Sequence, residues 1–218
     1  MLGTRGVRLG FVRPGLYEAQ VLALMEAVCD RLKDGGSPIV EIMIPLTISG
    51  PELECARGWV QDAIDRSADR PGLKMANIKI GTMIETPRAA LVAGELASFA
   101  DFFSFGTNDL TQMTYGFSRD DVEGRLMELY LEKQLISHNP FERIDVEGVG
   151  ELVRIGIEYG KKAKPSLTIG VCGEHGGNPA SIDLFVNLGM DYVSCSPFRV
   201  PVARLAAAQA VLRRRTGN

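Results

Sequence analysis

Short apolar segments alternate with longer segments of helical periodicity along most of the chain. The apolar segments are 38–46 (PIVEIMIPL), 77–85 (NIKIGTMIE), 101–106 (DFFSFG), 167–172 and 191–196. Their length and their boundaries are typical of buried strands. Helical patterns occupy 51–69, a segment from 87, 108–115, a segment from 146, a segment from 178, and 201–215. Five strand-then-helix units in succession predict a parallel sheet with right-handed crossovers.

The second predicted strand has two chemically different faces. Since alternate residues point to opposite sides of a strand, one side has Ile78, Ile80 and Ile84 and the other has Lys79, Gly81, Met83 and Glu85. We expect the apolar side against helices and the mixed side inside a barrel, with Glu85 at the rim. The same alternation directs Cys172 inward. Cys195 falls with Val193 on the helix-facing side, and Cys29 repeats at helical spacing with Leu22 and Met25. Both patterns are typical of core thiols.

These features predict a single α/β domain over residues 1–218, of the (β/α)8 TIM-barrel type. Such a barrel usually takes about 250 residues and eight strands. The chain supplies five strands, or six if the segment 5–11 contributes one. We therefore expect an incomplete barrel of five to six βα units, or an open sheet. Because strand number and stagger are linked in a closed barrel, the terminal strands should expose edges that favour a homo-oligomer.

Composition narrows the class of protein. A net charge of −3 without a basic stripe argues against nucleic-acid binding. The apolar runs are too short and too interrupted to span a membrane. The four cysteines lack CxxC spacing, which argues against a zinc site and fits a reducing cytoplasm. The sequence contains no Ser/His/Asp arrangement, Walker loop or Rossmann motif.

The glycine-rich segment GVCGEHGG at 170–177 directly follows the fourth strand and contains Cys172 and His175. Glycines permit positive φ angles and close approach of the backbone to a ligand. In parallel α/β proteins, active sites lie at this carboxyl end of the strands. Cys172 is therefore a candidate catalytic residue, and the alternative is a purely structural turn. His175 could orient a neighbour.

Two acidic residues follow successive strands. Glu85 ends the second strand, and Asp109 lies just beyond the third, after Gly106, Thr107 and Asn108. Neighbouring parallel strands are about 5 Å apart, so both carboxylates can reach one cation. Oxygen ligands with vacant positions suit Mg²⁺ or Mn²⁺. The turn also offers backbone N–H groups to a substrate anion, and the alternative for Asp109 is a helix-capping role.

Arg5 and Arg8 lie in GTRGVRLG at 3–10, where flanking glycines allow a guanidinium to reach a carboxylate or phosphate. An ordinary surface position is the alternative for both. His138 precedes Asn139 and Pro140 in the long insertion, and we expect it to be exposed or to have its hydrogen bonds satisfied by the turn.

Four separated motifs resemble the phosphoenolpyruvate/pyruvate-binding domain of the pyruvate, phosphate dikinase family. They are GTMIETPRAAL at 81–91, FFSFGTNDLTQMTYGFSRDD at 102–121, GVCGEHGGNPAS at 170–181 and SPFRVPVARLAAAQA at 196–210. The resemblance covers essentially the whole chain. The histidine of CGEHGG and the MTYGFSRDD continuation are more similar to the dikinase than to phosphoenolpyruvate synthase or enzyme I of the sugar phosphotransferase system.

The resemblance implies a (β/α)8 barrel in which a phosphohistidine on a separate domain exchanges its phosphoryl group with pyruvate enolate. By matching motif, Glu85 and Asp109 would hold Mg²⁺, and Arg5 would bind the anionic end of the substrate. Cys172 would move the proton at the substrate methyl carbon. The further substrate contacts would be Gly106, Thr107, Asn108 and Asp109.

The chain also departs from that family. The nucleotide-binding and phosphohistidine domains are absent, as is a further substrate arginine that the family carries upstream of the GxRGxRLG motif. The chain thus resembles the C-terminal portion of a barrel, and we expect it not to perform the full ATP-coupled reaction alone. Three rival hypotheses remain: a phosphoenolpyruvate synthase-like enzyme, a lyase of the same superfamily, and a binding or dimerisation fragment without catalysis.

Overall fold

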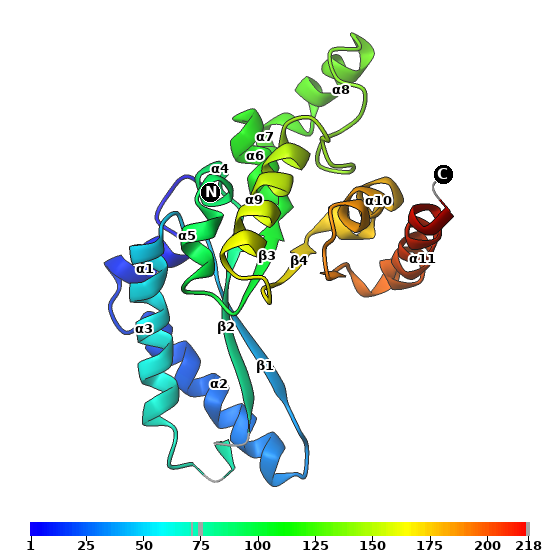
Figure 1. Cartoon of the computed structure of the whole chain (residues 1–218). Helices are drawn as coiled ribbons and strands as arrows, with labels where there is room; N and C mark the ends of the chain where they lie inside the picture. Colours follow the sequence, from blue (N-terminus) through cyan, green and yellow to red (C-terminus); the bar gives the residue numbers. More distant parts are fainter. Residues whose placement is uncertain (71, 74–75, 217–218) are drawn as a thin grey trace.

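The computed structural model describes residues 1–70, 72–73 and 76–216, which contain one parallel five-stranded sheet (Figure 1). In chain order the strands are β1 (Ile39–Ile44), β2 (Asn77–Ile84), β3 (Phe102–Gly106), β4 (Thr168–Cys172) and β5 (Tyr192–Val193). Every neighbouring pair is parallel. The predicted α/β class is confirmed, and the open sheet is consistent with an incomplete (β/α) barrel, since a closed one has eight strands.

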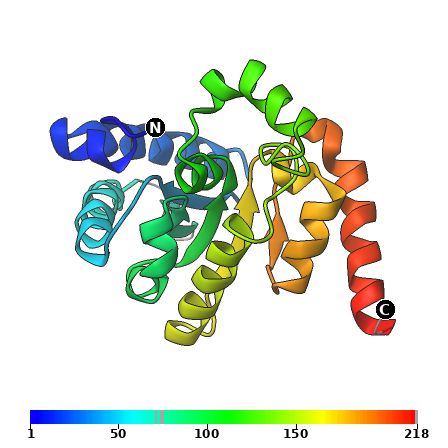
Figure 2. The ribbon, with the colours of Figure 1, turned by 90° about the horizontal axis from the view of Figure 1, so that it is seen from above.

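Helices connect the strands, and most of them follow one another in an arc around one side of the sheet, whereas the two helices between residues 119 and 132 lie apart from this arc (Figure 2). They are α1 (Val7–Val12), α2 (Leu16–Lys33), α3 (Gly50–Arg66), α4 (Pro87–Leu91), α5 (Ala93–Ala97), α6 (Thr107–Tyr115), α7 (Arg119–Val122), α8 (Arg125–Glu132), α9 (Val149–Ala163), α10 (Pro179–Asn187) and α11 (Val200–Thr216), with short 3₁₀ helices η2 (Glu174–Gly177) and η3 (Pro197–Arg199). Within the described ranges, no helix combines the length and apolar character that a bilayer crossing needs.

Side-chain caps explain where three of the predicted helices begin. The Ser49 side chain accepts the N–H of Glu52 before α3, and Thr86 and Asn178 cap α4 and α10 in the same way. Each cap is followed by a proline in the first turn of the helix. A side-chain acceptor and a pre-set φ angle there favour helix initiation, which is why local sequence located these helices well.

Tertiary contacts correct the prediction at two elements. The segment 5–11 is not a sixth strand, because it forms α1, whose Val7 N–H donates to the Pro45 carbonyl oxygen at 3.1 Å. Helix α9 begins at Val149 and not at 146. The Asp145 carboxylate accepts the N–H groups of Gly148 and Val149, each at 3.0 Å. These bonds favour a helix that begins at Val149, three residues after the start that the apolar pattern indicates.

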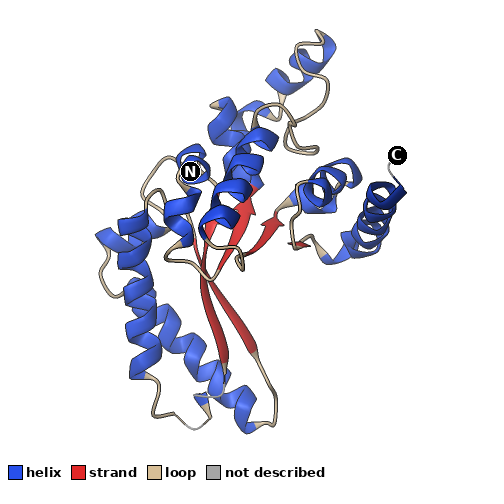
Figure 3. Ribbon diagram, viewed as in Figure 1, coloured by secondary structure: helices blue, strands red, loops and turns tan. Residues whose placement is uncertain are grey.

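The two faces of the sheet differ in the way that alternation along β2 predicted. On the helix-facing side, Ile84, Phe103 and Phe105 are fully buried in the main core. On the other side, Ile39 and Met43 of β1 are 72% and 38% exposed. Strands β1 and β5 form the two edges of the sheet (Figure 3). The side of the sheet that faces away from the helices is therefore partly exposed to solvent at the β1 edge.

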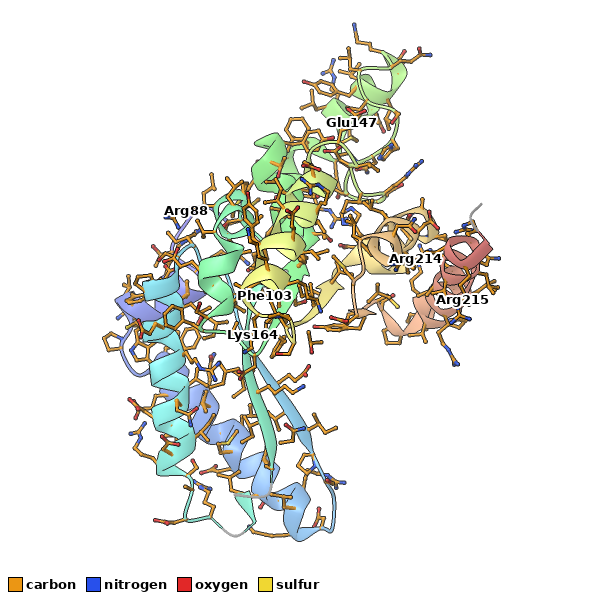
Figure 4. The ribbon with its side chains drawn as sticks, viewed as in Figure 1. Arg88, Phe103, Glu147, Lys164, Arg214 and Arg215 are labelled. Atoms are coloured by element: carbon orange, nitrogen blue, oxygen red, sulfur yellow. The ribbon has the colours of Figure 1, made fainter. Side chains whose placement is uncertain are left out.

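Two aspartates, each just before a strand, hydrogen-bond to the backbone of the neighbouring strand. Asp101, just before β3, donates its N–H to the Ile80 carbonyl at 2.8 Å and accepts the Ile80 N–H at 2.9 Å through its carboxylate. Asp191, just before β5, makes the same pair of bonds with Ile169 of β4, at 2.8 Å each. Lys164, at the lower end of α9 (Figure 4), lies 3.8 Å from the Asp101 carboxylate. These hydrogen bonds fix the register of β3 against β2 and of β5 against β4, away from the carboxyl end that holds the candidate site.

Candidate functional site

The GTRG segment packs against the loop after β1. Gly6 has a φ angle of +55°, and a Cβ on it would lie 3.2 Å from the Pro45 carbonyl oxygen, so glycine is required there. Arg8 donates to the carbonyl oxygens of Met1 and Gly3 at 2.9 and 3.0 Å. The exposed Arg5 side chain makes no such local bond among the described residues. Arg5 is thus the arginine left available for a ligand.

Glu85 is a buried carboxylate at the carboxyl end of β2. It is 5% exposed, and its Oε1 accepts the N–H of Leu46 at 2.7 Å. Burial raises the pKa of Glu85 to about 7; the Leu46 hydrogen bond opposes this rise, and the charge of Asp109 adds to it. The positive charges of Arg5 and Arg8 lower it in part. An ionised Glu85 is therefore costly unless a cation lies beside it.

The turn after β3 lies directly against Glu85. Gly106 has no room for a side chain, because a Cβ there would overlap the Glu85 carboxylate and lie 2.8 Å from the Met83 methyl carbon. Helix α6 begins at Thr107 without a side-chain cap, so its first N–H groups are not capped by the preceding residue. The Asn108 side chain donates to the Asp109 carboxylate at 3.0 Å.

The donor set fits Mg²⁺ bound partly by the protein. No group of three or more histidine, cysteine or acidic side chains able to hold a metal occurs in the described part of the chain. The charge of Asp109 nevertheless raises the pKa of Glu85, so ionised Glu85 is costly without a cation beside it. Mg²⁺ in proteins commonly takes one or two carboxylates and completes its shell with water and substrate oxygens. Two hard oxygen donors in a partly desolvated position match that chemistry.

Cys172 lies across from Gly106 in the β3–β4 ladder. Its sulfur is half-buried, 3.6 Å from the Phe105 carbonyl oxygen. Burial raises the pKa of the Cys172 thiol, a hydrogen bond with Ser104 lowers it in part, and the charges of Glu85 and Asp109 raise it further. The thiol is therefore held in its protonated form at neutral pH, as a proton donor requires.

Cys29 and Cys195 lie apart from this chemistry. Cys29 is 2% exposed in the main core, and Cys195 is half-buried against the small cluster around Ile182. The position of Cys29 agrees with the core assignment made from its helical spacing, whereas Cys195 is only half-buried and also lines the hollow beside the turn after β4. Cys172 is the thiol that interacts with both candidate metal ligands.

The sequence motifs gave Arg119 no role, and for His175 they indicated only that it could orient a neighbour. Arg119 donates to the Asn108 side-chain oxygen at 3.0 Å and to Glu174 at 2.9 Å, so it ties the start of α6 to the turn after β4. His175 is 1% exposed and bonds to Thr107. The MTYGFSRDD and CGEHGG motifs contained both residues, but nothing in their spacing indicated the partners.

A hollow of about 740 Å³ opens beside the turn after β4. Arg119, Gly173, Glu174, Ser194 and Arg199 are among its lining residues. Neither Glu85 nor Asp109 lines it. Glu85 instead follows the last residue of β2, and Asp109, in the first turn of α6, is near enough for its charge to raise the pKa of Glu85.

Comparison of the sequence with known proteins places the chain in a family. Residues 1–212 match the family described as "PEP-utilising enzyme, PEP-binding domain". The chain is 51% identical over 212 residues to "Pyruvate, phosphate dikinase, chloroplastic" of Flaveria pringlei, which covers 97% of this chain and 22% of that protein. It is 52% identical over 215 residues to "Pyruvate, phosphate dikinase 1, chloroplastic" of Arabidopsis thaliana, with the same coverage. For "Pyruvate, phosphate dikinase 2" of Zea mays the identity is 52% over 212 residues, or 97% of this chain and 24% of the relative. The chain thus spans less than a quarter of the length of these relatives.

Proposed function

Since the chain belongs to the PEP-binding domain family of PEP-utilising enzymes, we propose that it carries the phosphoenolpyruvate/pyruvate half-reaction of a pyruvate, phosphate dikinase. In this half-reaction a phosphoryl group passes between a phosphohistidine on another domain and pyruvate enolate. The observation that carries the proposal is the buried Glu85 carboxylate, which interacts electrostatically with Asp109 and Arg5 at the carboxyl edge of the sheet, where β4 carries Cys172.

Glu85 and Asp109 are the proposed ligands of Mg²⁺, which when bound supplies positive charge beside the substrate oxygen. Arg5 binds the anionic end of the substrate, because its side chain is exposed and its charge is close enough to Glu85 to lower the pKa of that carboxyl in part. The turn of Gly106, Thr107 and Asn108 contacts the substrate from the side of β3.

Cys172 is the proposed acid and base at the substrate methyl carbon. After phosphoryl transfer from phosphoenolpyruvate to the carrier histidine, the thiol donates its proton to the methylene carbon of the enolate, forming the new C–H bond of pyruvate. In the reverse direction the thiolate removes that proton. The raised pKa of the thiol favours the protonated form that the first direction needs.

The remaining features of the proposal concern the whole enzyme. The chain acts as a single domain, the C-terminal portion of a barrel, and receives its phosphoryl group from a phosphohistidine domain elsewhere. Homodimerisation would cover the open sheet, and a cytoplasmic location remains a prediction, although two of the relatives are named chloroplastic. The rival enzymes share the acids and the metal, but a lyase would not need Cys172.

Calorimetric titration of Mn²⁺ in the presence of oxalate, an enolate mimic, tests the proposal. We expect binding to the parent chain and none to Glu85→Ala or Asp109→Ala. Glu41→Ala is the matched control, since Glu41 is a half-exposed acid of β1 that pairs with Lys79 at 3.5 Å. Equal affinity in the parent and in both site variants would exclude the metal site. Turnover of phosphoenolpyruvate by the isolated chain would favour an enzyme over a binding fragment, and C–C bond cleavage would favour the lyase.

A further inference from the structure

His175 uses both of its ring nitrogens inside the protein. The side chain is 1% exposed. Its Nδ1 lies 2.7 Å from the Thr107 hydroxyl, and its Nε2 lies 2.8 Å from the carbonyl oxygen of Pro140. The ring therefore joins the turn after β4 to the first residue of α6 and to the long insertion.

These partners determine which nitrogen carries the hydrogen. A carbonyl oxygen only accepts hydrogen bonds, so Nε2 must donate to Pro140. Burial lowers the pKa of His175 against the opposing effect of the Pro140 hydrogen bond, which favours the neutral ring. In a neutral ring with its hydrogen on Nε2, Nδ1 can only accept. The Thr107 hydroxyl is then the donor to Nδ1.

The orientation of Thr107 follows from this assignment. Its hydroxyl has one hydrogen and two acceptors within reach, namely His175 Nδ1 at 2.7 Å and the Cys172 carbonyl oxygen at 3.3 Å. The shorter bond to His175 takes the hydrogen. The Cys172 carbonyl oxygen, at 3.3 Å, is then the weaker second acceptor of the same Thr107 hydrogen.

We propose that His175 is a positioning residue that holds the Thr107 hydroxyl and thereby fixes the turn after β3 against the turn that carries Cys172. This inference rests on the proposed function, in which both turns contact the substrate. Arg119 reinforces the same junction through Asn108 and Glu174, so two separate ties hold α6 to the turn. His175 itself stays out of contact with the substrate and acts through Thr107.

Nitrogen-15 NMR of the histidine rings tests the hydrogen-bond arrangement directly. The chain has only two histidines, and His138→Gln removes the second signal. We expect the neutral His175 ring with hydrogen on Nε2, and a shift of its Nδ1 resonance in Thr107→Val, which lacks the hydroxyl donor. A hydrogen on Nδ1, or a Nδ1 resonance unchanged in Thr107→Val, would overturn the proposal.

Oxalate binding with Mn²⁺ tests whether the arrangement serves the site. His175→Ala and Thr107→Val should each weaken oxalate binding about tenfold, the size expected for one lost hydrogen bond. If His175 acts through Thr107, the double variant should be no weaker than either single variant. His175→Asn should recover most of the affinity, because its side-chain oxygen can take the place of Nδ1. His138→Ala is the matched control and should bind like the parent.

The outcomes separate this proposal from the proposed function. Losses that multiply to about a hundredfold in the double variant would mean that the two side chains act independently, which contradicts the proposal. If the parent chain binds no oxalate, the proposed function fails, and the NMR comparison still decides whether His175 holds the Thr107 hydroxyl. Should His175→Ala fail to fold, the proposal is still tested by near-parental oxalate binding in His175→Asn, by the loss in Thr107→Val, and by the NMR comparison; a tenfold loss in His175→Asn would contradict it.

Discussion

Replacing Glu85 with glutamine should stabilise the metal-free protein at alkaline pH and remove its affinity for divalent cations. The side chain is 5% exposed, and burial raises its pKa to about 7. Glutamine keeps an oxygen that can accept the Leu46 N–H, which Glu85 now accepts at 2.7 Å. The substitution therefore removes a costly negative charge with little change in shape or hydrogen bonding.

The magnitude follows from the change in the pKa of Glu85. An exposed glutamate has a pKa of 4.5, against about 7 in the folded chain. At roughly 1.4 kcal/mol per pH unit, this difference corresponds to about 3 kcal/mol. The folded protein holds this proton more tightly than the unfolded chain does. The stabilising contribution is therefore complete below pH 4.5, is lost as the pH rises through the folded pKa, and does not change further at higher pH.

Urea unfolding in EDTA at pH 5 and pH 8 measures the effect. We expect the gain in the free energy of unfolding from Glu85→Gln to be about 2–3 kcal/mol larger at pH 8 than at pH 5. Glu41→Gln, at a half-exposed ion pair with Lys79, is the control without this burial. Mn²⁺ at about a hundred times its dissociation constant should stabilise the parent by about 3 kcal/mol and leave Glu85→Gln unchanged. An equal gain at both pH values, or equal protection of both proteins by Mn²⁺, would refute the reasoning.

Three further predictions concern the proposed proton transfer at Cys172, the hydrogen bonds of Asp101 and the turn after β4 that contains Gly176. Cys172→Ala should stop exchange of pyruvate methyl protons with D2O, followed by NMR in a protein of the relatives' length, while oxalate binding persists; exchange at the parental rate would remove Cys172 from the mechanism. Asp101→Ala should lower the free energy of unfolding by about 2–3 kcal/mol, because it leaves the Ile80 N–H without its carboxylate acceptor, whereas Asp101→Asn should lose less; equal losses in urea unfolding would contradict this. Gly176→Ala should lower the thermal midpoint, because its Cβ would overlap the Ser194 carbonyl oxygen, and an unchanged midpoint would argue against that contact.

The sequence by itself determined the class of fold and the side of the sheet on which the candidate chemistry lies. Alternation has a period of two along a strand, so it places Glu85 and Cys172 on the inward side without any knowledge of the tertiary structure. The ladder agrees, since Gly106 pairs with Cys172 and the Glu85 carboxylate occupies the space beside Gly106. The roles of these residues stay predictions, because chemistry depends on a metal and a substrate and not on the backbone alone.

Tertiary structure decided features that depend on partners distant along the chain. The segment 5–11 (RGVRLGF) has apolar side chains at only three of its seven positions, and periodicity cannot distinguish a strand from a helix over so few residues. In the folded chain α1 forms here, and its Val7 N–H donates to the Pro45 carbonyl oxygen. His175 and Thr107 are 68 residues apart, and Arg119 and Glu174 are 55 apart. No local pattern specifies such pairs. They form because parallel strands bring the loops at their carboxyl ends to one edge of the sheet, where the hydrogen-bonding partners of a buried ring are set by the fold.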